Sequence, residues 1–532
     1  MTLSPLDIHG IINNTPDTEL TLTIKKPSGN FKQLTCWVND VLEISPETTT
    51  IPCKDKSIVT FLNCVLRLSV TLQNAVGVPT FKIPMVTEVT DLGDSIEVEL
   101  IQYRLSGFMP ETFTGSLQHA ISICHKSLTT EPTDNNILSL MSHIESKVIP
   151  DIRIMVAYSN ATVPVIKAAG ERGIPFVCLG KGIYQLGTGS SQRRIKGSMS
   201  DRDSSIGVDI AGDKFVASST LRNMGFPTPE HYMVTRLEHA LGVVEDLGYP
   251  VVVKPVDGDR GEGVTINVDN DAMLRGAVQK GMNASISKVL LIEKPVEGVC
   301  HRLFITNGKM VYAVKRDPIY VVGNGVDTIL SLNEKEKTRQ DKRPVWNREP
   351  FAHFDYTTEL HLQLTGMDGQ TVPAEGEVVY LRAIESTQDG GIDEDMTKKI
   401  HPDNIDMAIR ATKVLGLDIA GVDIIGKDLS VPWHKSDMVI TDINPSPTFC
   451  AASISRSYLP EFIDTYFEGD CCIPVIQEDE VLKNVEEGIR YAVLSGEKVT
   501  WSDGKEWYHK GTHQEQLRML LLDPTFDALF IV

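Results

Sequence analysis

The chain has few of the features that mark extracellular, zinc-stabilised or membrane-spanning proteins. Its nine cysteines are scattered and none forms a C-x-x-C pair. Neither a disulfide framework nor a zinc site is therefore expected, and the reducing cytoplasm is the expected compartment. No stretch approaches ~20 uninterrupted apolar residues, which argues against a membrane span. The first residues, MTLSPLDIHG, lack a basic segment followed by an apolar run, so no signal peptide is expected.

Basic residues are also fewer than acidic ones. Lys and Arg number 51 against 71 Asp and Glu, which gives a formal net charge of −20. This balance argues against nucleic acid and an anionic membrane surface as partners, although a local basic site can still exist in an acidic protein. Of the 532 residues, 41% are hydrophobic and 23% charged. We therefore expect a globular protein of about three or four domains.

The N-terminal third carries no chemical motif. Residues 1–150 are expected to form an α+β domain, with strands at Leu20–Lys25, Ser57–Phe61 and Ser95–Ile101 and helices at Ser116–Ser127 and Asn136–Val148. Residues 151–205 are expected to form a βαβ unit with a parallel sheet, made of a strand at Ile152–Ala157, a helix at Val163–Arg172 and a strand at Ile174–Leu179.

The strongest local signal is the stretch VVVKPVDGDRGEG, from Val251 to Gly263. A β-branched run predicts a buried strand that ends at Lys254-Pro255, and a glycine-rich loop follows. Glycines at this density let backbone N–H groups approach a ligand, and a lysine beside them suits a polyphosphate. Taken alone, the motif is equally typical of a loop between two strands with a surface lysine.

The elements around this motif are also readable. The pattern predicts helices at Asp209–Leu221, which contains Lys214, and at Leu237–Leu247, and strands at Val264–Val268 and Val289–Glu293. A β-hairpin joining Cys300–Ile305 to Lys309–Val314 is predicted by the turn dipeptide Asn307-Gly308.

Six segments in order carry a resemblance to a known family. They are QLGTGSSQRRIKGSMSDRDSSIGVDIAGDK, VVVKPVDGDRGEGV, HRLFITNGKMVYAVKRDP, VVGNGVDTI, GGIDEDMTKKIHPDN and GLDIAGVDII. Together they resemble the ATP-grasp superfamily and, within it, the ATP-grasp region of the cyanophycin synthetase family, over roughly Gly180–Cys472. The resemblance implies an ATP-grasp domain at residues 206–472, with a lid subdomain at about 225–300, in a multidomain chain of α/β and α+β class.

The last part of the chain resembles the start of a further domain. Residues 473–532 are similar to early strands and a helix of a Mur-ligase-like domain, but they lack its glycine-rich ATP loop. We interpret them as a truncated Mur-like remnant; an unrelated small α/β cap is the alternative.

The resemblance implies an ATP- and Mg²⁺-dependent carboxylate–amine ligase. Such an enzyme forms a peptide or isopeptide bond between amino-acid or small-peptide substrates through an acyl phosphate, releasing ADP and phosphate. A cytoplasmic homo-oligomer is expected. Two alternatives stay open: an ATP-grasp kinase that phosphorylates a small molecule, and a catalytically inactive ATP-binding scaffold.

Site residues follow from the resemblance by matching position. Lys214 and Lys254 match the two phosphate-binding lysines, and Glu293 and Val296 match the adenine edge. The full ATP-binding set is Lys214, Lys254, Asp257, Gly258, Gly261, Gly263, Val264, Glu293 and Val296. The expected catalytic residues are Arg302, Lys254 and, as a second candidate cation, Arg316. Substrate contacts are expected from Asp209, Arg260, Gly390 and Gly391.

The expected metal ligands are Asp423, Asp442 and Asn444. The two aspartates lie on neighbouring expected strands, and Asn444 shares a strand face with Asp442 because the side-chain period is two. Carboxylate and amide oxygens suit Mg²⁺; two solvated strand-end aspartates are the structural alternative. The family usually has Glu in place of Asp442 and a carboxylate in place of Cys300, so a different or narrower substrate than that of cyanophycin synthetases is expected.

Overall fold

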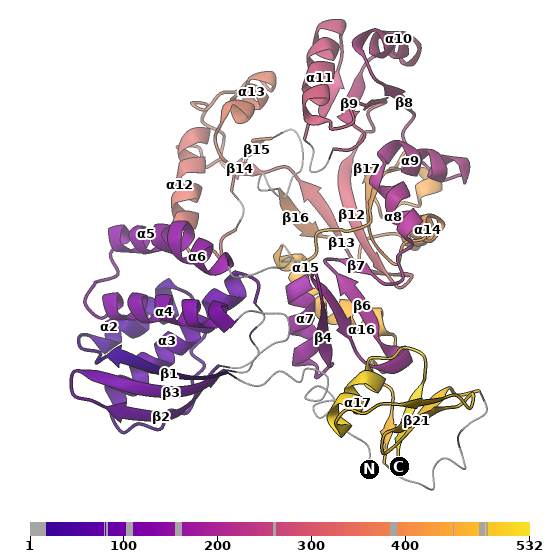
Figure 1. The fold of residues 1–532 in the computed structure, drawn as a ribbon. Coiled ribbons are helices and arrows are strands. Elements are labelled where there is room, and N and C mark those ends of the chain that lie inside the picture. Colours follow the sequence, from indigo (N-terminus) through magenta and orange to yellow (C-terminus); the bar gives the residue numbers. More distant parts are fainter. Residues whose placement is uncertain are drawn as a thin grey trace. The chain divides into compact units, whose positions relative to one another are not determined.

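The structure is a computed structural model that mixes helices and sheets throughout the chain (Figure 1). It describes residues 18–78, 80, 83–102, 110–154, 162–258, 262–349, 351–382, 391–450, 452–477, 485 and 488–532. The chain divides into two compact units. Unit 1 comprises Met1–Gly197, Asp341–Arg348 and Phe467–Val532, and unit 2 comprises Ser198–Gln340 and Glu349–Tyr466. The predicted mixed α/β and α+β class is confirmed, whereas the predicted domain boundaries stay a prediction.

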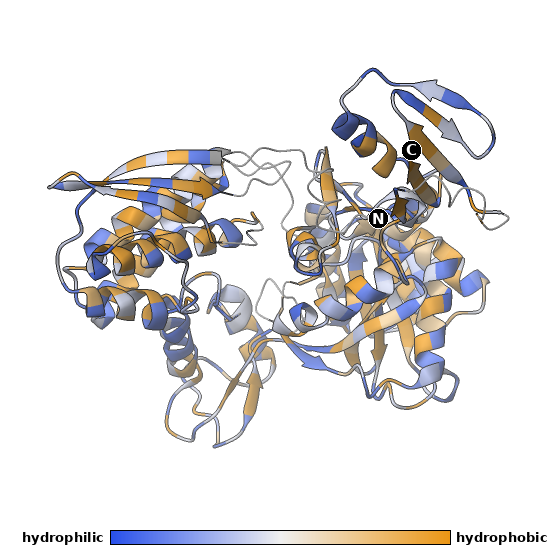
Figure 2. Ribbon diagram, turned by 90° about the horizontal axis from the view of Figure 1, so that it is seen from below, coloured by the Kyte–Doolittle hydropathy of each residue, from blue (hydrophilic) through white to orange (hydrophobic). Residues whose placement is uncertain are grey.

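Unit 1 begins with a three-stranded antiparallel sheet, in the order β1-β3-β2, packed against helices. Along β3, hydrophobic and polar residues alternate, and the hydrophobic ones are buried in a core shared with α3 and α4 (Figure 2). The elements are β1 (Thr18–Lys25), α2 (Phe31–Cys36), a π-helical turn (Trp37–Val41), α3 (Lys56–Ala75), β2 (Met85–Asp91), β3 (Ser95–Gln102), α4 (Pro110–Ser127), α5 (Asp134–His143), a second π-helical turn (Ile144–Val148) and α6 (Ile149–Arg153).

The strand predicted at Ser57–Phe61 is wrong, because these residues open the 20-residue helix α3. The carboxylate of Asp55 caps the helix by accepting hydrogen bonds from the backbone N–H groups of Ser57 and Ile58, and such a cap outweighs the β preference of a short β-branched run. By length and composition α3 could cross a membrane, but 67% of its most apolar window is buried inside the fold. This burial is typical of a core helix.

The predicted βαβ unit is wrong at the start of its first strand, and the parallel pairing of its two strands stays a prediction. Ile152 lies in α6 rather than in a strand, and residues 155–157 lie outside the described part of the chain. The helix α7 (Thr162–Glu171) is present as predicted. The following strand, β4 (Phe176–Gly180), turns back through Lys181 and Gly182, both with positive φ, and pairs antiparallel with β5 (Ile183–Leu186). The partner of β4 that the structure describes is therefore β5, in a tight antiparallel hairpin. After β5 come a 3₁₀ turn (Gly189–Ser191) and β6 (Arg193–Lys196), which pairs antiparallel with β5.

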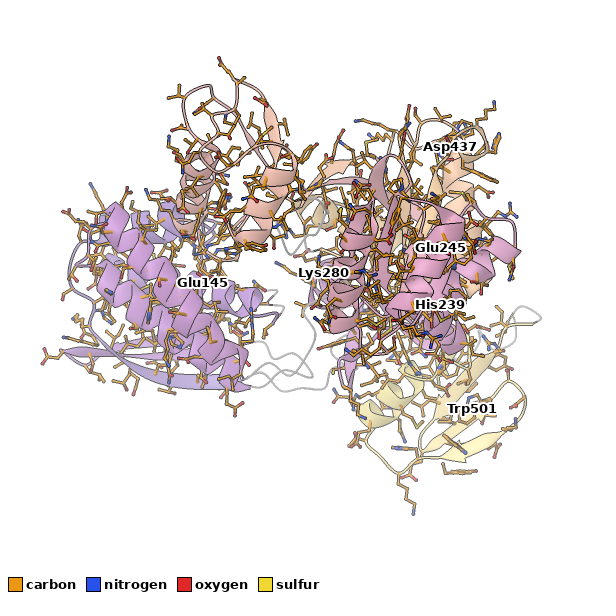
Figure 3. The ribbon with its side chains drawn as sticks, turned by 90° about the horizontal axis from the view of Figure 1, so that it is seen from above. Glu145, His239, Glu245, Lys280, Asp437 and Trp501 are labelled. Atoms are coloured by element: carbon orange, nitrogen blue, oxygen red, sulfur yellow. The ribbon has the colours of Figure 1, made fainter. Side chains whose placement is uncertain are left out.

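The C-terminal residues of unit 1 form a small α/β sheet in the order β19-β23-β20-β21-β22, with β23 parallel to both its neighbours. Trp501, labelled in Figure 3, packs edge-to-face against Trp507 with ring centroids 5.5 Å apart. The Mur-like origin of this part stays a prediction. Its elements are β19 (Val475–Ile476), β20 (Tyr491–Ser495), β21 (Lys498–Trp501), β22 (Glu506–Tyr508), α17 (His513–Leu521) and β23 (Ala528–Ile531).

Unit 2 contains two sheets that position the candidate site. The first, the lid sheet, has the order β10-β9-β11-β8 and shares a core with α10 and α11. The second, the central sheet, has the order β16-β13-β12-β17-β18 and packs one face against α14. A short ribbon, β14 paired with β15, lies with α12 and α13 in a third cluster.

The bounds of the elements of unit 2 complete the description. They are β7 (Met199–Ser200), α8 (Ser205–Gly212), α9 (Lys214–Asn223), β8 (His231–Val234), α10 (Leu237–Leu247), β9 (Val251–Pro255), β10 (Thr265–Val268), α11 (Asp271–Ala284), β11 (Leu290–Glu293), β12 (Val299–Thr306), β13 (Lys309–Asp317), β14 (Tyr320–Val322), α12 (Ile329–Asp341), α13 (Tyr356–Leu364), β15 (Val378–Tyr380), β16 (Ile392–Asp395), α14 (Pro402–Leu415), β17 (Ile419–Gly426), a 3₁₀ turn (Trp433–Lys435), β18 (Val439–Asn444), α15 (Ser453–Ser457) and α16 (Leu459–Phe467).

Two local predictions in unit 2 have clear outcomes. The hairpin between β12 and β13 is confirmed, and its turn residues Asn307 and Gly308 have φ of 49° and 69°, as a tight hairpin turn requires. The single helix predicted over Asp209–Leu221 is wrong, because the chain breaks at Asp213 into α8 and α9. The Asp213 carboxylate caps α9 by accepting from the N–H groups of Phe215 and Val216. Lys214 is therefore the first residue of a helix and not an interior one.

Candidate active site

One face of the central sheet packs into a hydrophobic core, and the other carries charged side chains. On β12, Leu303 and Ile305 are fully buried in the core that includes α14. Side chains alternate along a strand, so Arg302 lies on the opposite face. There the strand register places Arg302 beside Asp423 of β17, and Asp423 beside Asp442 of β18. We call this surface the charged face; its members are Arg302, Arg316, Asp393, Asp423, Asp442 and Asn444.

At the centre of the charged face, Arg302 and Asp423 form a two-pronged ion pair. The guanidinium Nε donates to Oδ1 at 2.7 Å and Nη2 donates to Oδ2 at 2.5 Å. Burial disfavours the charged form of Asp423, but the guanidinium more than offsets this and holds the pKa of the carboxyl below its usual value. Gly421 makes this geometry available, because a Cβ there would stand 3.2 Å from the Cδ of Arg302. The predicted catalytic arginine and the predicted metal ligand are thus direct neighbours.

A second ion pair extends the same row. The Nζ of Lys214 lies 2.9 Å from Oδ2 of Asp442, and Asn444 on the same strand donates from Nδ2 to Oδ2 of Asp423 at 3.2 Å. The structure therefore brings together a predicted phosphate lysine and the three predicted metal ligands. Because α9 starts at Lys214, the position of this lysine depends directly on the Asp213 cap.

The other end of the charged face holds Arg316 and Asp393, which face each other without a hydrogen bond. They are register partners on β13 and β16, and Nε of Arg316 is 3.9 Å from Oδ1 of Asp393. Both of these atoms are buried and have no hydrogen-bond partner. Burial raises the pKa of Asp393 despite the opposing effect of Arg316 and Arg302. Sequence reasoning missed Asp393: it recognised the segment GGIDEDMTKKIHPDN but assigned only the glycines that open it.

The lid sheet carries the remaining predicted cation. The Nζ of Lys254 on β9 lies 2.8 Å from Oε1 of Glu293 on the adjacent strand β11, and the two side chains are only 12% and 10% exposed. Glu293 had been expected at the adenine edge. In the structure its carboxylate neutralises Lys254, and the adenine contact stays a prediction. Val296, the other expected adenine contact, is half-buried in the segment after β11.

A chain of contacts connects the lid sheet to the charged face within unit 2. Phe215, next to Lys214 in α9, packs edge-to-face against the ring of His231 at 5.3 Å. His231 on β8 is in turn the register partner of Glu293. Phe215, His231, Glu293 and Lys254 thus form a series of neighbouring residues that runs from the start of α9 into the lid sheet. His231 was not anticipated, because Phe215, Ser218 and Ser219, which contact it, come from another element, α9.

The glycine-rich loop is partly explained by packing. Gly263 has a φ of 76°, and a Cβ there would stand 2.8 Å from Cγ of Pro255 and 2.7 Å from Cβ of Ala284. Asp257 uses its carboxylate to accept from the Ser285 hydroxyl and the Ser287 N–H, at 2.8 and 2.7 Å. Both residues therefore have structural roles in addition to the ATP contact predicted for them.

The other predicted contacts are less informative. Gly258 and Val264 flank the loop and are described, whereas Arg260, Gly261 and Gly390 lie outside the described residues. Asp209 is exposed on α8, and Gly391 immediately precedes β16. The assignment of these residues to ATP or substrate stays a prediction.

The expected magnesium ligands are compatible with a hard cation. Among the described residues no group of three or more His, Cys, Asp or Glu side chains gathers at one point, but the predicted set needs only two carboxylates and an amide. Asp423 and Asp442 are register partners, and the carboxamide oxygen of Asn444 is left over when its nitrogen donates to Asp423. Each carboxylate is balanced here by a cation, Arg302 or Lys214. The donor set fits Mg²⁺ once phosphate competes for those cations.

Comparison with known proteins yields matches centred on this region. Residues 213–303 match the family model described as the ATP binding domain of the carbamoyl-phosphate synthase L chain. The chain is 33% identical over 333 residues to the cyanophycin synthetase of Geminocystis herdmanii, which covers 62% of this chain and 38% of that protein. It is 30% identical over 242 residues to a glutathione biosynthesis bifunctional protein of Mannheimia succiniciproducens, covering 44% of this chain and 32% of that protein.

The chain thus spans less than half the length of these curated relatives. Among solved structures, a bifunctional glutathione synthetase from Pasteurella multocida aligns over 81% of this chain and 73% of its own, with a TM-score of 0.44 and 17% identity. The family-model match at residues 213–303 includes Lys214, Lys254, Glu293 and Arg302.

Proposed function

We propose that this chain, whose central part belongs to the ATP-grasp superfamily, is an ATP- and Mg²⁺-dependent carboxylate–amine ligase. It would join amino-acid or small-peptide substrates by a peptide or isopeptide bond and release ADP and phosphate. The observation that carries the proposal is the unbroken row of paired charges formed by Lys214, Asp442, Asp423 and Arg302 on one face of the central sheet.

The chemistry explains why such a row is useful. A carboxylate cannot expel oxide, so an acid must first become a mixed anhydride with phosphate before an amine can displace the phosphate. Transfer of the phosphoryl group requires neutralisation of negative charge more than it requires a nucleophilic side chain. Lys214, Lys254 and Arg302 supply that positive charge, and all three are at least partly withdrawn from water.

Each of these cations has a carboxylate partner, so binding of Mg·ATP would exchange partners. Phosphate oxygens would replace the carboxylates as neighbours of the cations, and Asp423, Asp442 and Asn444 would be left to hold Mg²⁺. The metal would supply further neutralisation of the phosphates. Because the charges are already paired within the protein, the site does not leave buried like charges uncompensated before the nucleotide arrives.

The charged groups of the site suit amino acids and short peptides as substrates. Amino acids and short peptides carry both a carboxylate to activate and an ammonium to attack, and the charged face offers both signs of charge within a few residues. Cys300, on the register row of Arg316, provides no carboxylate where the family usually has one. We therefore propose a substrate pair different from, or narrower than, that of cyanophycin synthetases.

The test is an ADP-release assay of the purified chain with Mg·ATP and amino acids or dipeptides, supplied singly and in pairs, with mass spectrometry of the products. A ligase releases ADP only when an acid and an amine are both present, and its product has the mass of the two substrates less water. ADP release with a single compound, together with a phosphorylated product, would replace the proposal with a kinase. Nucleotide binding without ADP release across the panel would replace it with an ATP-binding scaffold.

A further inference from the structure

Asp393 lies at the edge of the charged face and has no place in the role assignments above. It sits on β16, the outermost strand of the central sheet, beside Arg316 of β13. Its side chain is only 11% exposed. Its neighbour in sequence, Glu394, points to the other face and pairs there with Lys315 and Lys399. Glu394 is thus exposed and paired with two lysines, whereas Asp393 is buried.

The Arg316–Asp393 pair has unused hydrogen-bonding capacity. The 3.9 Å between Nε and Oδ1 is too long for a hydrogen bond, and neither atom has another partner although both are buried. Buried polar atoms are almost always hydrogen-bonded. Two such atoms facing each other across a short gap therefore mark a place where a polar ligand atom would be held.

The surroundings of Asp393 are mostly cationic or apolar. From β13, Arg316 and the buried ring of Tyr312 approach it, and from β12, Arg302 does. Arg456, the charged residue of the adjacent helix α15, instead donates to the Cys450 carbonyl at 3.4 Å. Asp395, on the same strand, accepts from the Tyr458 hydroxyl. Asp395 already has the Tyr458 hydroxyl as a partner, whereas Oδ1 of Asp393 has none, so a cationic ligand would find its acceptor in Asp393.

We propose that Asp393 receives the incoming amine of the ligation: its carboxylate holds the substrate ammonium beside Arg316 and takes one proton from it. This inference rests on the proposed ligase function and adds to it the residue that prepares the nucleophile. Burial also raises the pKa of Asp393, which moves the carboxyl toward the range in which a proton acceptor is effective near neutral pH.

The ammonium transfers one proton to Asp393 and becomes a neutral amine, whose lone pair attacks the carbonyl carbon of the acyl phosphate. The C–N bond forms, the C–O bond to phosphate breaks, and the departing phosphate carries the second amine proton away. Asp393 then returns its proton to water. The adjacent Arg316 would balance negative charge on the carbonyl oxygen during the attack.

The test separates the two half-reactions with the variant Asp393→Asn and the control Glu394→Gln, which removes the neighbouring charge on the opposite face. Hydroxylamine is uncharged near neutral pH and needs no base, so it traps the acyl phosphate as a hydroxamate. The panel of amino acids and dipeptides is assayed with Mg·ATP, once with hydroxylamine and once with the amine substrate. Asp393→Asn is expected to keep wild-type hydroxamate formation and to lose amide formation by ~100-fold or more. Glu394→Gln is expected to keep both.

Raising the pH provides a readout that a structural role would not change. Amide formation by Asp393→Asn is expected to rise about tenfold per pH unit, as free amine becomes available without the base, whereas the wild type rises less steeply. Equal amide rates in Asp393→Asn and wild type, or loss of hydroxamate formation as well, would overturn the inference while leaving the ligase proposal standing. Absence of hydroxamate with the wild-type protein would overturn both.

Discussion

Opposite charges are paired at most of the predicted cation positions that the structure describes in unit 2. Lys254 is held by Glu293, Lys214 by Asp442 and Arg302 by Asp423. A buried charge without a partner is costly, and removal of one partner of a buried pair typically costs 3–5 kcal/mol. Single substitutions in these pairs therefore affect both catalysis and stability, and a matched second substitution is needed to separate the two effects.

Lys254→Met is expected to abolish ADP release, by more than ~100-fold, because it removes a cation from the transferring phosphoryl group. It also leaves Glu293 buried without its partner. The double variant Lys254→Met/Glu293→Gln is expected to recover thermal stability, measured by circular dichroism, but no turnover.

The exposed Lys288 of the same lid provides the control for Lys254. Lys288→Met is expected to have wild-type turnover. Wild-type activity in Lys254→Met would remove this lysine from the site.

In the C-terminal part of unit 1, the carboxylate of Asp527 accepts hydrogen bonds from the Arg490 side chain, at 2.7 and 3.1 Å, which lowers its pKa to about 2 from the usual 3.8. A carboxyl with a depressed pKa stabilises the fold above its unfolded pKa, and this contribution is lost as the pH falls through the folded value. Arg490 is largely exposed, so Asp527→Asn is expected to cost about 1 kcal/mol at neutral pH.

The pH dependence is the critical part of this prediction. The difference in thermal midpoint between wild type and Asp527→Asn should be constant above about pH 5 and should narrow as the pH falls below 3.8 toward 2. Thermal unfolding followed at neutral pH and at about pH 3 measures the change. A difference that widens in acid would contradict the assigned ion pair.

At the scale of elements, the break between α8 and α9 decides where Lys214 is presented. Asp213 ends one helix, caps the next and so makes Lys214 the first residue of α9, close to Asp442. The positive end of a helix also favours phosphate nearby. The position of the lysine thus follows from a capping interaction one residue earlier in the chain.

Removal of the Asp213 cap should weaken nucleotide binding, although Asp213 is not itself an expected ATP contact. Asp213→Ala is expected to cost ~1 kcal/mol of stability, because two N–H groups of α9 lose their acceptor. We expect the Kd for Mg·ATP, measured by calorimetry, to rise as the start of α9 loosens. Asp213→Ser keeps a good cap and is expected to bind like the wild type; equal binding by the Ala variant would show that the cap does not position Lys214.

At the scale of the whole molecule, the charged face and the lid sheet both belong to unit 2, whereas unit 1 has its own hydrophobic core built on α3 and α4. A ligand that binds one folded unit stabilises that unit by mass action, by ~2.7 kcal/mol at a hundredfold excess over Kd. Separate cores also favour separate unfolding transitions.

We therefore expect two transitions in differential scanning calorimetry, of which Mg·ATP raises only one. Lys254→Met should remove that shift and leave the other transition unchanged. A shift of both transitions by the same amount would mean that the two units unfold as one, and the absence of any shift would contradict nucleotide binding.

The sequence by itself determined several elements of unit 2, in places where the signal was local. The Asn307-Gly308 turn, the helix Leu237–Leu247 and the strand ending at Lys254 were all readable, because each rests on the conformational preferences of a few adjacent residues. The residues assigned to phosphate and metal follow from the ordered motifs, and their roles stay predictions. Local preference predicted the wrong element at Ser57–Phe61 and missed the helix break at Asp213. In each case a side-chain cap, from Asp55 or from Asp213, outweighed the propensity of the neighbouring residues.

Only the tertiary structure decided which of those residues are partners. The pairing of Lys254 with Glu293, the row from Lys214 to Arg302 and the unbonded approach of Arg316 to Asp393 all arise between elements that are separated in the sequence. Strand register sets these neighbours, and register depends on the packing of whole faces rather than on any local pattern. The motifs thus indicate which kinds of side chain the chain carries, and the sheet determines which charged side chains become neighbours.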